Sequence, residues 1–178
     1  MKMLKKLLAV VLTGAMALTL FTACGSNAVR DKDIADALNN IVKLNDSEVT
    51  FTPRAKEREM AQKVATLLES HSEDDSNSAE LSAKIQGILG IDQGGVNENN
   101  FVWVQNALTD KLGAEGQAFQ VMESLTDKGG AYNFSSLGSK EPADTRYMGT
   151  ALCKIPDQKD NLVTVRVIVV TAKAEDEK

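Results

Sequence analysis

The stretch that decides the fold class is LVTVRVIVVTA, residues 162–172, close to the C-terminus. Successive side chains of a β-strand point to opposite faces, so residues two apart share a face. Within this stretch Val163, Val165, Val167 and Val169 share one face. Thr164, Arg166, Ile168 and Val170 share the other. Because β-branched residues are enriched in strands, the stretch is predicted to be a strand.

A second strand is predicted just upstream, at residues 146–154, RYMGTALCK. The segment IPDQKDN between the two stretches contains Pro156, Asp157 and Asn161, which are residue types that favour a turn. The two strands are therefore expected to form an antiparallel hairpin. An isolated hairpin is only marginally stable in water, so this one must pack against other elements.

Those other elements are predicted to be helices, because apolar residues upstream recur every three or four positions. The expected helical segments are residues 31–44, 52–70, a shorter one around 81–89, 101–112 and one around 118–125. Thr52 is expected to cap the second segment and Pro53 to be its first helical residue. Gly113 is expected to end the fourth. Residues 131–144 are expected to form a long loop.

This order of elements predicts an α+β fold with about five helices followed by a C-terminal antiparallel β-hairpin. The predicted single compact domain covers residues 31–173, and residues 174–178 form a charged tail. The chain from Cys24 to the C-terminus at residue 178 has 155 residues, a length that suits one domain.

The N-terminus carries a separate signal. Three lysines within the first six residues precede an almost uniformly apolar stretch at residues 7–21, and small residues follow at 22–23. A basic region, a short apolar core and a small-residue site together are typical of a secretory signal peptide. The core is short for a membrane-spanning helix, which needs roughly 20 apolar residues. Residues 1–23 are therefore predicted to be a signal peptide.

The residues around the expected cleavage site, Phe21-Thr22-Ala23-Cys24, resemble the lipobox of bacterial lipoproteins. The resemblance implies cleavage before Cys24, diacylglycerol on its thiol and acylation of its amino group. Two or three acyl chains hold a protein firmly on a membrane, at about 0.8 kcal/mol per buried methylene. Residues 24–30 would then be a tether to the extracytoplasmic face of a bacterial cell membrane.

The charge of the mature chain argues against nucleic acid as a partner. The whole sequence has 20 basic and 25 acidic residues. Removing the signal peptide removes three lysines and no acid, which leaves 17 basic and 25 acidic residues and a net charge of −8. Binding to nucleic acid by counterion release needs clustered Lys and Arg, which an acidic surface does not offer.

The chain offers few groups for metal or covalent chemistry. With Cys24 lipidated, Cys153 stands alone, so no internal disulfide is expected and Cys153 is predicted to be a small buried residue of the hairpin. A zinc site needs several His, Cys or carboxylate ligands, and the sequence has one histidine. No serine lies in a G-x-S-x-G turn. No metal, cofactor or catalytic set is therefore predicted.

A series of short motifs occurs along the chain in a particular order. They are Leu38-Asn39-Asn40 in the first helix, EMAQKVA at 59–65, His71, Asn97-Glu98-Asn99, and the closing strands YMGTA at 147–151 and VTVRVIVV at 163–170. In order and residue type they resemble the CAP superfamily of SCP-like extracellular domains. That family has an Asn-containing helix, an Ala-rich helix, a His, a Gly-Glu-Asn motif and two closing strands.

The resemblance implies a degenerate member that keeps the fold. Asn97 stands where the family has Gly, and His71 is the only histidine of the chain, so the family's second His is missing. The ligand-binding candidates that follow are His71 and Glu98 from the family motifs, together with Tyr132 as one of few aromatic side chains. At the end of a helix and before acidic residues, His71 is expected to be exposed and not paired with Glu98.

Three functions remain open on the sequence. The first is a non-catalytic domain of the cell envelope that binds a protein, peptide or glycan. The second is a small hydrolase that uses His71 and Glu98 as an acid–base pair. The third is a solute-binding lipoprotein, although such proteins usually need two lobes and this chain suits one domain.

Overall fold

The computed structural model describes residues 29–44, 47–70, 78–91, 100–108, 112–126, 140–156 and 161–176. In chain order these hold α2 (Asp31–Leu44), β1 (Thr50–Pro53), α3 (Ala55–Ser70), α4 (Ser78–Leu89), β2 (Asn100–Leu108), α5 (Ala114–Thr126), β3 (Lys140–Pro156) and β4 (Leu162–Asp176). The fold is α+β, as predicted, with four helices and four strands in this part of the chain.

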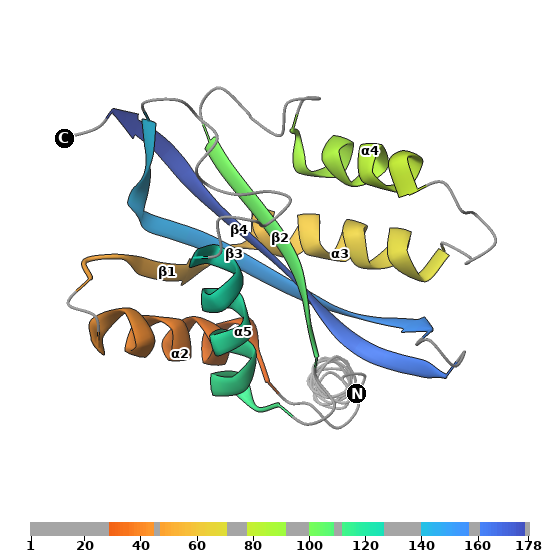
Figure 1. The fold of residues 1–178 in the computed structure, drawn as a ribbon, viewed down its shortest axis with the longest axis horizontal. Helices are drawn as coiled ribbons and strands as arrows, with labels where there is room; N and C mark the ends of the chain where they lie inside the picture. The colour runs from red at the N-terminus through yellow and green to blue at the C-terminus, as the bar shows by residue number, and fades with distance from the viewer. Residues whose placement is uncertain are drawn as a thin grey trace, which may run out of the picture.

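The sheet has four strands in the order β1-β3-β4-β2 (Figure 1). The long strands β3 and β4 form the expected antiparallel hairpin at its centre. β2 adds to β4 in antiparallel direction. β1 adds to the other side of β3 in parallel direction, with Thr50 opposite Thr145 and Pro53 opposite Met148. The hairpin is therefore the middle of a mixed sheet rather than the whole of one.

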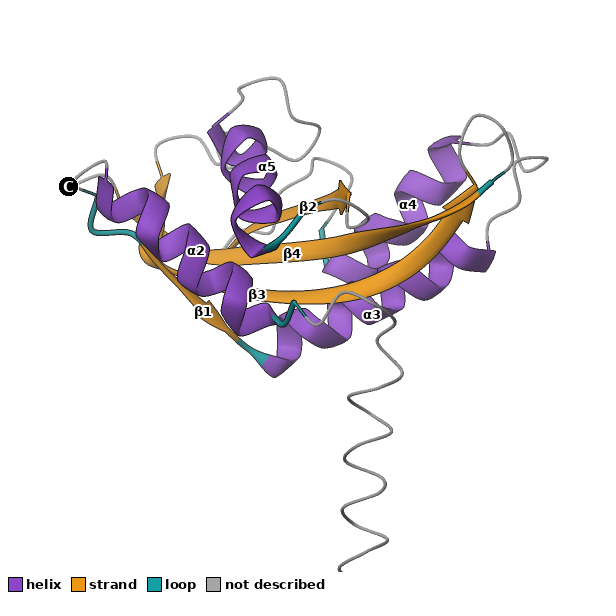
Figure 2. Cartoon of the chain, turned by 90° about the horizontal axis from the view of Figure 1, so that it is seen from below, coloured by secondary structure: helices purple, strands orange, loops and turns teal. Residues whose placement is uncertain are grey.

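Helices cover both faces of this sheet and make three layers. α2 and α5 pack on one face, in a first core that includes Ile34, Leu38 and Val121. α3 and α4 pack on the other, in a second core that includes Ala61, Val64 and Leu89. Figure 2 shows the sheet between α2 and α5 on one side and α3 on the other.

The alternation predicted for the last strand is confirmed in β4. The valines of one face are buried in the second core, namely Val165, Val167 and Val169. Residues of the other face are buried in the first core, namely Ile168, Val170 and Ala172. Both faces are apolar because each is covered by helices, as in other sheets buried on two sides.

The helix predicted at 101–112 is wrong, because residues 100–108 form strand β2. Phe101 and Trp103 face the first core, while Val102 between them faces the second. A strand buried on both faces is a continuous apolar run, and such a run also satisfies a spacing of three to four. The aromatic and β-branched residues of FVWV favoured the strand.

The start predicted for the second helix is also wrong. Thr52 and Pro53 belong to strand β1, and α3 begins at Ala55. Proline has no amide hydrogen, so it is tolerated in edge strands such as β1. The next residue, Arg54, continues the contact by donating its amide to the carbonyl of Met148 at 2.8 Å.

The remaining helical segments are confirmed as α2, α4 and α5. The two closing strands are longer than expected. β3 begins at Lys140, inside the predicted loop, and β4 continues to Asp176, past the predicted end at 172. No described helix is both long enough and apolar enough to cross a membrane.

Helix α3 lies very close to the backbone of the sheet at Gly149 of β3. A Cβ atom built on Gly149 would lie 1.9 Å from the backbone nitrogen of Arg58 and 2.3 Å from the carbonyl carbon of Glu57. Both atoms belong to the backbone of α3, which cannot move aside as a flexible side chain could. Helix α3 therefore lies directly on the sheet only because residue 149 has no side chain.

Gly149→Ala is expected to destabilise the domain by about 3 kcal/mol or more, because overpacking against fixed backbone forces the two layers apart. Gly87→Ala is the matched control. Gly87 lies in α4 with nothing within 4 Å of its built Cβ, so alanine there should stabilise by about 0.5–1 kcal/mol. Urea unfolding of both variants measures the difference. Equal stability of the two variants would contradict the close contact.

Candidate functional site

The ligand-binding residues predicted from the sequence, His71, Glu98 and Tyr132, lie outside the described residues, as does Cys24. Their roles and the separation of His71 from Glu98 stay predictions. The prediction that Cys153 is buried in the hairpin is confirmed, since its side chain is in the second core. Trp103 is buried in the first core.

The structure brings together a polar cluster that the sequence did not predict. The Glu57 cluster consists of Arg54, Glu57, Tyr147 and Thr171. Arg54 follows the last residue of β1, and Glu57 lies in the first turn of α3. Tyr147 of β3 and Thr171 of β4 are directly opposite each other in the sheet. Three strands and one helix thus meet at this cluster.

Glu57 is fully buried and held by three hydrogen bonds. Arg54 Nε donates to Oε2 at 2.6 Å, and Arg54 Nη2 donates to Oε1. The hydroxyl of Thr171 donates to Oε1 at 2.7 Å. Burial by itself raises the pKa of Glu57, but the hydrogen bonds from Arg54 and Thr171 and the charge of Arg54 outweigh it. The pKa of Glu57 is lowered overall, so this buried carboxylate is ionised at neutral pH.

Arg54 closes the cluster toward solvent. Its side chain is 40% exposed, and the guanidinium lies 3.8 Å from the centre of the Tyr147 ring. Stacking on an aromatic face and bidentate pairing with a carboxylate are the two geometries that suit arginine best. Arg54 and Thr171 together engage both carboxylate oxygens of Glu57, and the side chain of Glu57 has no exposed surface. Its role is to position α3 on the sheet.

A second group of polar side chains, the Asp31 cluster, includes Thr150, the residue that follows Gly149 in β3. Its members are Asp31, Arg58, Gln117, Thr150 and Arg166. Asp31 Oδ2 accepts from Arg58 Nε at 2.7 Å, and Asp31 Oδ1 accepts from the hydroxyl of Thr150. Thr150 in turn accepts from Arg166 Nη1 at 3.0 Å. These contacts link the start of α2 to α3 through Arg58, and to β3 and β4 through Thr150 and Arg166.

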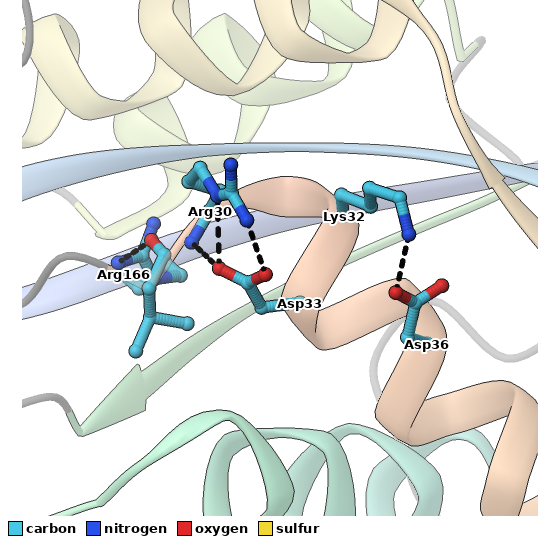
Figure 3. A network of polar contacts seen from close by, with 6 residues as sticks. Arg30, Lys32, Asp33, Asp36 and Arg166 are labelled. Carbon is cyan, nitrogen blue, oxygen red and sulfur yellow. Dashed lines mark hydrogen bonds and ion pairs between the residues drawn. The ribbon is translucent and has the colours of Figure 1, made fainter.

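Arg166 also binds helix α5 and the segment before α2. Its Nε donates to Gln117 Oε1 of α5 at 2.8 Å, and its Nη2 donates to the carbonyl of Val29 at 2.9 Å. Figure 3 shows Arg166 beside the first turn of α2. Arginine has five donors in a rigid fork, so a single buried side chain can tie several backbone segments together.

The N-terminus of α2 is fixed by local contacts (Figure 3). Asp33 accepts from the backbone nitrogen of Arg30 at 2.8 Å, as the third residue of a helix does in a capping box. The Arg30 guanidinium also binds this carboxylate and, with the backbone bond, lowers the pKa of Asp33 to about 2. Lys32 pairs with Asp36 at 2.6 Å. Such exposed pairs contribute little to stability.

Metal and nucleophile chemistry have no support among these contacts. Within the described ranges no group of three or more His, Cys, Asp or Glu residues is arranged to hold a metal ion. Burial, together with the charge of Glu69, raises the pKa of Cys153 to about 11. At neutral pH this thiol is almost entirely protonated, and a protonated buried thiol is a poor nucleophile.

No protein-family model, no curated protein and no solved structure matches this chain. The assignment of a function therefore rests on the residues of the chain itself.

Sequence reasoning missed both clusters, and only part of each could have been found. Arg54 and Glu57 are three residues apart at the start of a helix, a spacing that allows side-chain pairing. An arginine inside the apolar run of β4 was a further signal, because a buried Arg166 needs partners. The partners themselves, Thr150 and Val29, are 16 and 137 residues away in sequence and could not have been read from it.

Glu57→Gln is expected to lower the free energy of unfolding at neutral pH by about 1.5–3 kcal/mol, since hydrogen bonds to a charged group are lost. It should also reduce the loss of stability in acid. The pKa of Glu57 in the native state lies below its ordinary value of 4.5, so its contribution is complete above 4.5 and declines as pH falls further. Urea unfolding followed by Trp103 fluorescence from neutral pH to pH about 3 measures the slope.

Asp33→Asn is the control for this titration, because the pKa of Asp33 is also lowered but its carboxylate is partly exposed, in contrast to the fully buried Glu57. The effect of Asp33→Asn should largely disappear in about 1 M salt, where the Debye length is only about 3 Å. The effect of Glu57→Gln should persist there. An unchanged acid slope in Glu57→Gln would contradict the assignment of a buried ionised carboxylate.

Proposed function

We propose that this protein is a lipoprotein anchored through Cys24 at the extracytoplasmic face of a bacterial cell membrane, with a non-catalytic domain that binds a protein, peptide or glycan of the envelope. The observation that carries the proposal is the run Phe21-Thr22-Ala23-Cys24 at the end of a basic and then apolar stretch. Small residues before a cysteine at that place are the acceptor pattern for lipid attachment.

The binding role is supported by what the buried polar groups do. Glu57 is sealed by Arg54, and Asp31 is engaged by Arg58 and Thr150. A general acid or base must reach its substrate within hydrogen-bond distance, about 2.6–3.2 Å. Neither buried carboxylate is placed to do so. Recognition by exposed surface therefore fits the described part of the chain better than catalysis at these residues.

We further propose that the domain is a degenerate CAP-like domain. The order of elements supports this, since an Asn-containing helix, an Ala-rich helix and two closing strands occur as α2, α3, β3 and β4. The motif residues also carry structural contacts. Asn39 accepts from the Phe51 amide at 2.7 Å and donates to the Phe51 carbonyl at 3.0 Å, which ties α2 to β1. Gly149 of the first closing strand admits α3.

Lipid attachment is tested by metabolic labelling with a fatty acid. The wild-type chain should be labelled and should sediment with membranes, whereas Cys24→Ser should be unlabelled because the acceptor thiol is gone. Cys153→Ser is the matched control and should be labelled like the wild type, since Cys153 is buried in the folded domain. Equal labelling of Cys24→Ser and the wild type would contradict the anchor.

The alternative function, a small hydrolase, rests on the family resemblance of His71 and Glu98. An activity assay distinguishes it from the binding role. Cleavage of an envelope glycan or peptide by the purified protein, lost in His71→Ala, would replace the binding role with catalysis. Solute-binding lipoproteins usually need two lobes, whereas the described residues form one sheet with a core on each face. The fold therefore does not favour a solute-binding function.

A further inference from the structure

The point at which the chain joins the domain is fixed. The carbonyl of Val29 is held by Arg166 Nη2 at 2.9 Å, and the Val29 side chain packs against the first core. The next amide, that of Arg30, is bound by Asp33. Residues 29 and 30, which the sequence assigns to the tether, are therefore bonded to the domain.

The distance from the lipid to this point has an upper limit. Five residue steps separate Cys24 from Val29. A fully extended chain spans at most about 3.3–3.6 Å per residue, so Cys24 and Val29 are no more than about 18 Å apart in any conformation. A domain of about 150 residues has a radius of gyration near 15 Å and hence a diameter near 40 Å. The reach is less than half of that diameter.

We propose, on the basis of the lipid anchor proposed above, that the domain rests on the lipid headgroups with the first turn of α2 toward the bilayer and α4 away from it. A tether shorter than the domain allows only the side that contains Val29 to approach the membrane. α4 packs in the second core, across the sheet from Val29 and α2. Figure 1 shows α4 and α2 in different parts of the molecule.

The surface next to Val29 is polar and can contact lipid headgroups, but it has no net positive charge that would attract them. The side chains of Arg30 and Lys32 are 67% and 68% exposed there (Figure 3). Both are paired with neighbouring carboxylates, Asp33 and Asp36, so this turn has no excess positive charge. The orientation is therefore set by the length of the tether, and it should depend little on the content of anionic lipid.

The test uses the full lipidated protein in vesicles that contain a lipid-borne fluorescence quencher. A fluorophore is attached at Lys32→Cys or at Ala83→Cys, two exposed positions in α2 and α4. The Cys24 thiol is blocked by lipid and Cys153 is buried, so labelling is confined to the introduced cysteine. Quenching should be several-fold stronger at position 32 than at position 83, in vesicles with or without anionic lipid.

A control variant with about 20 Gly and Ser residues inserted after Asn27 should reduce this difference strongly. Such a linker has a root-mean-square length near 25 Å and lets the domain turn freely. Equal quenching at positions 32 and 83 in the lipidated protein with its natural tether would overturn the orientation and leave the anchor intact. A protein that carries no lipid would overturn both the proposed function and this inference.

Discussion

The contact between Gly149 of β3 and the backbone of α3 is the constraint on which the rest of the structure depends. With no side chain at residue 149, the first turn of α3 lies against the sheet, and the backbone of Glu57 and Arg58 makes this contact. Glu57 meets Thr171 of β4, and Arg58 meets Asp31 of α2. A helix held one side chain further out would lose both sets of bonds together.

The buried charges of the two polar clusters stabilise the packing of the helices on the sheet. A buried ion pair recovers the desolvation of its charges only when geometry is good and the remaining hydrogen-bonding atoms are satisfied. Glu57 meets this condition through Arg54 and Thr171. Loss of the hydrogen bonds to such a charged group costs about 1.5–3 kcal/mol, so the clusters favour one arrangement of helices on the sheet. Arg166 also fixes the segment before α2, because it donates a hydrogen bond to the carbonyl of Val29.

Part of this fold could be predicted from local patterns. α2 and α5 follow from the helical spacing of their apolar residues, and the hairpin follows from its β-branched strand and the turn residues before it. The burial of Cys153 follows from its apolar neighbours. β2 was predicted as a helix because Phe101, Val104 and Leu108 also fit a spacing of three to four, although the FVWV segment favours a strand. β1 has four residues, too few for a period, and it forms because β3 offers an edge.

The site was harder to predict than the fold, because its contacts join residues distant in sequence. Thr171 lies 114 residues from Glu57, and Thr150 lies 119 residues from Asp31. No local pattern encodes such pairs. Native-state amide hydrogen exchange tests the central claim most directly. Amides of Val64 in α3 and Met148 in β3 should exchange only through global unfolding, with those of α4 exchanging through a smaller opening. Exchange of α3 amides at a lower free energy than those of α4 would contradict the claim that the Gly149 contact organises the domain.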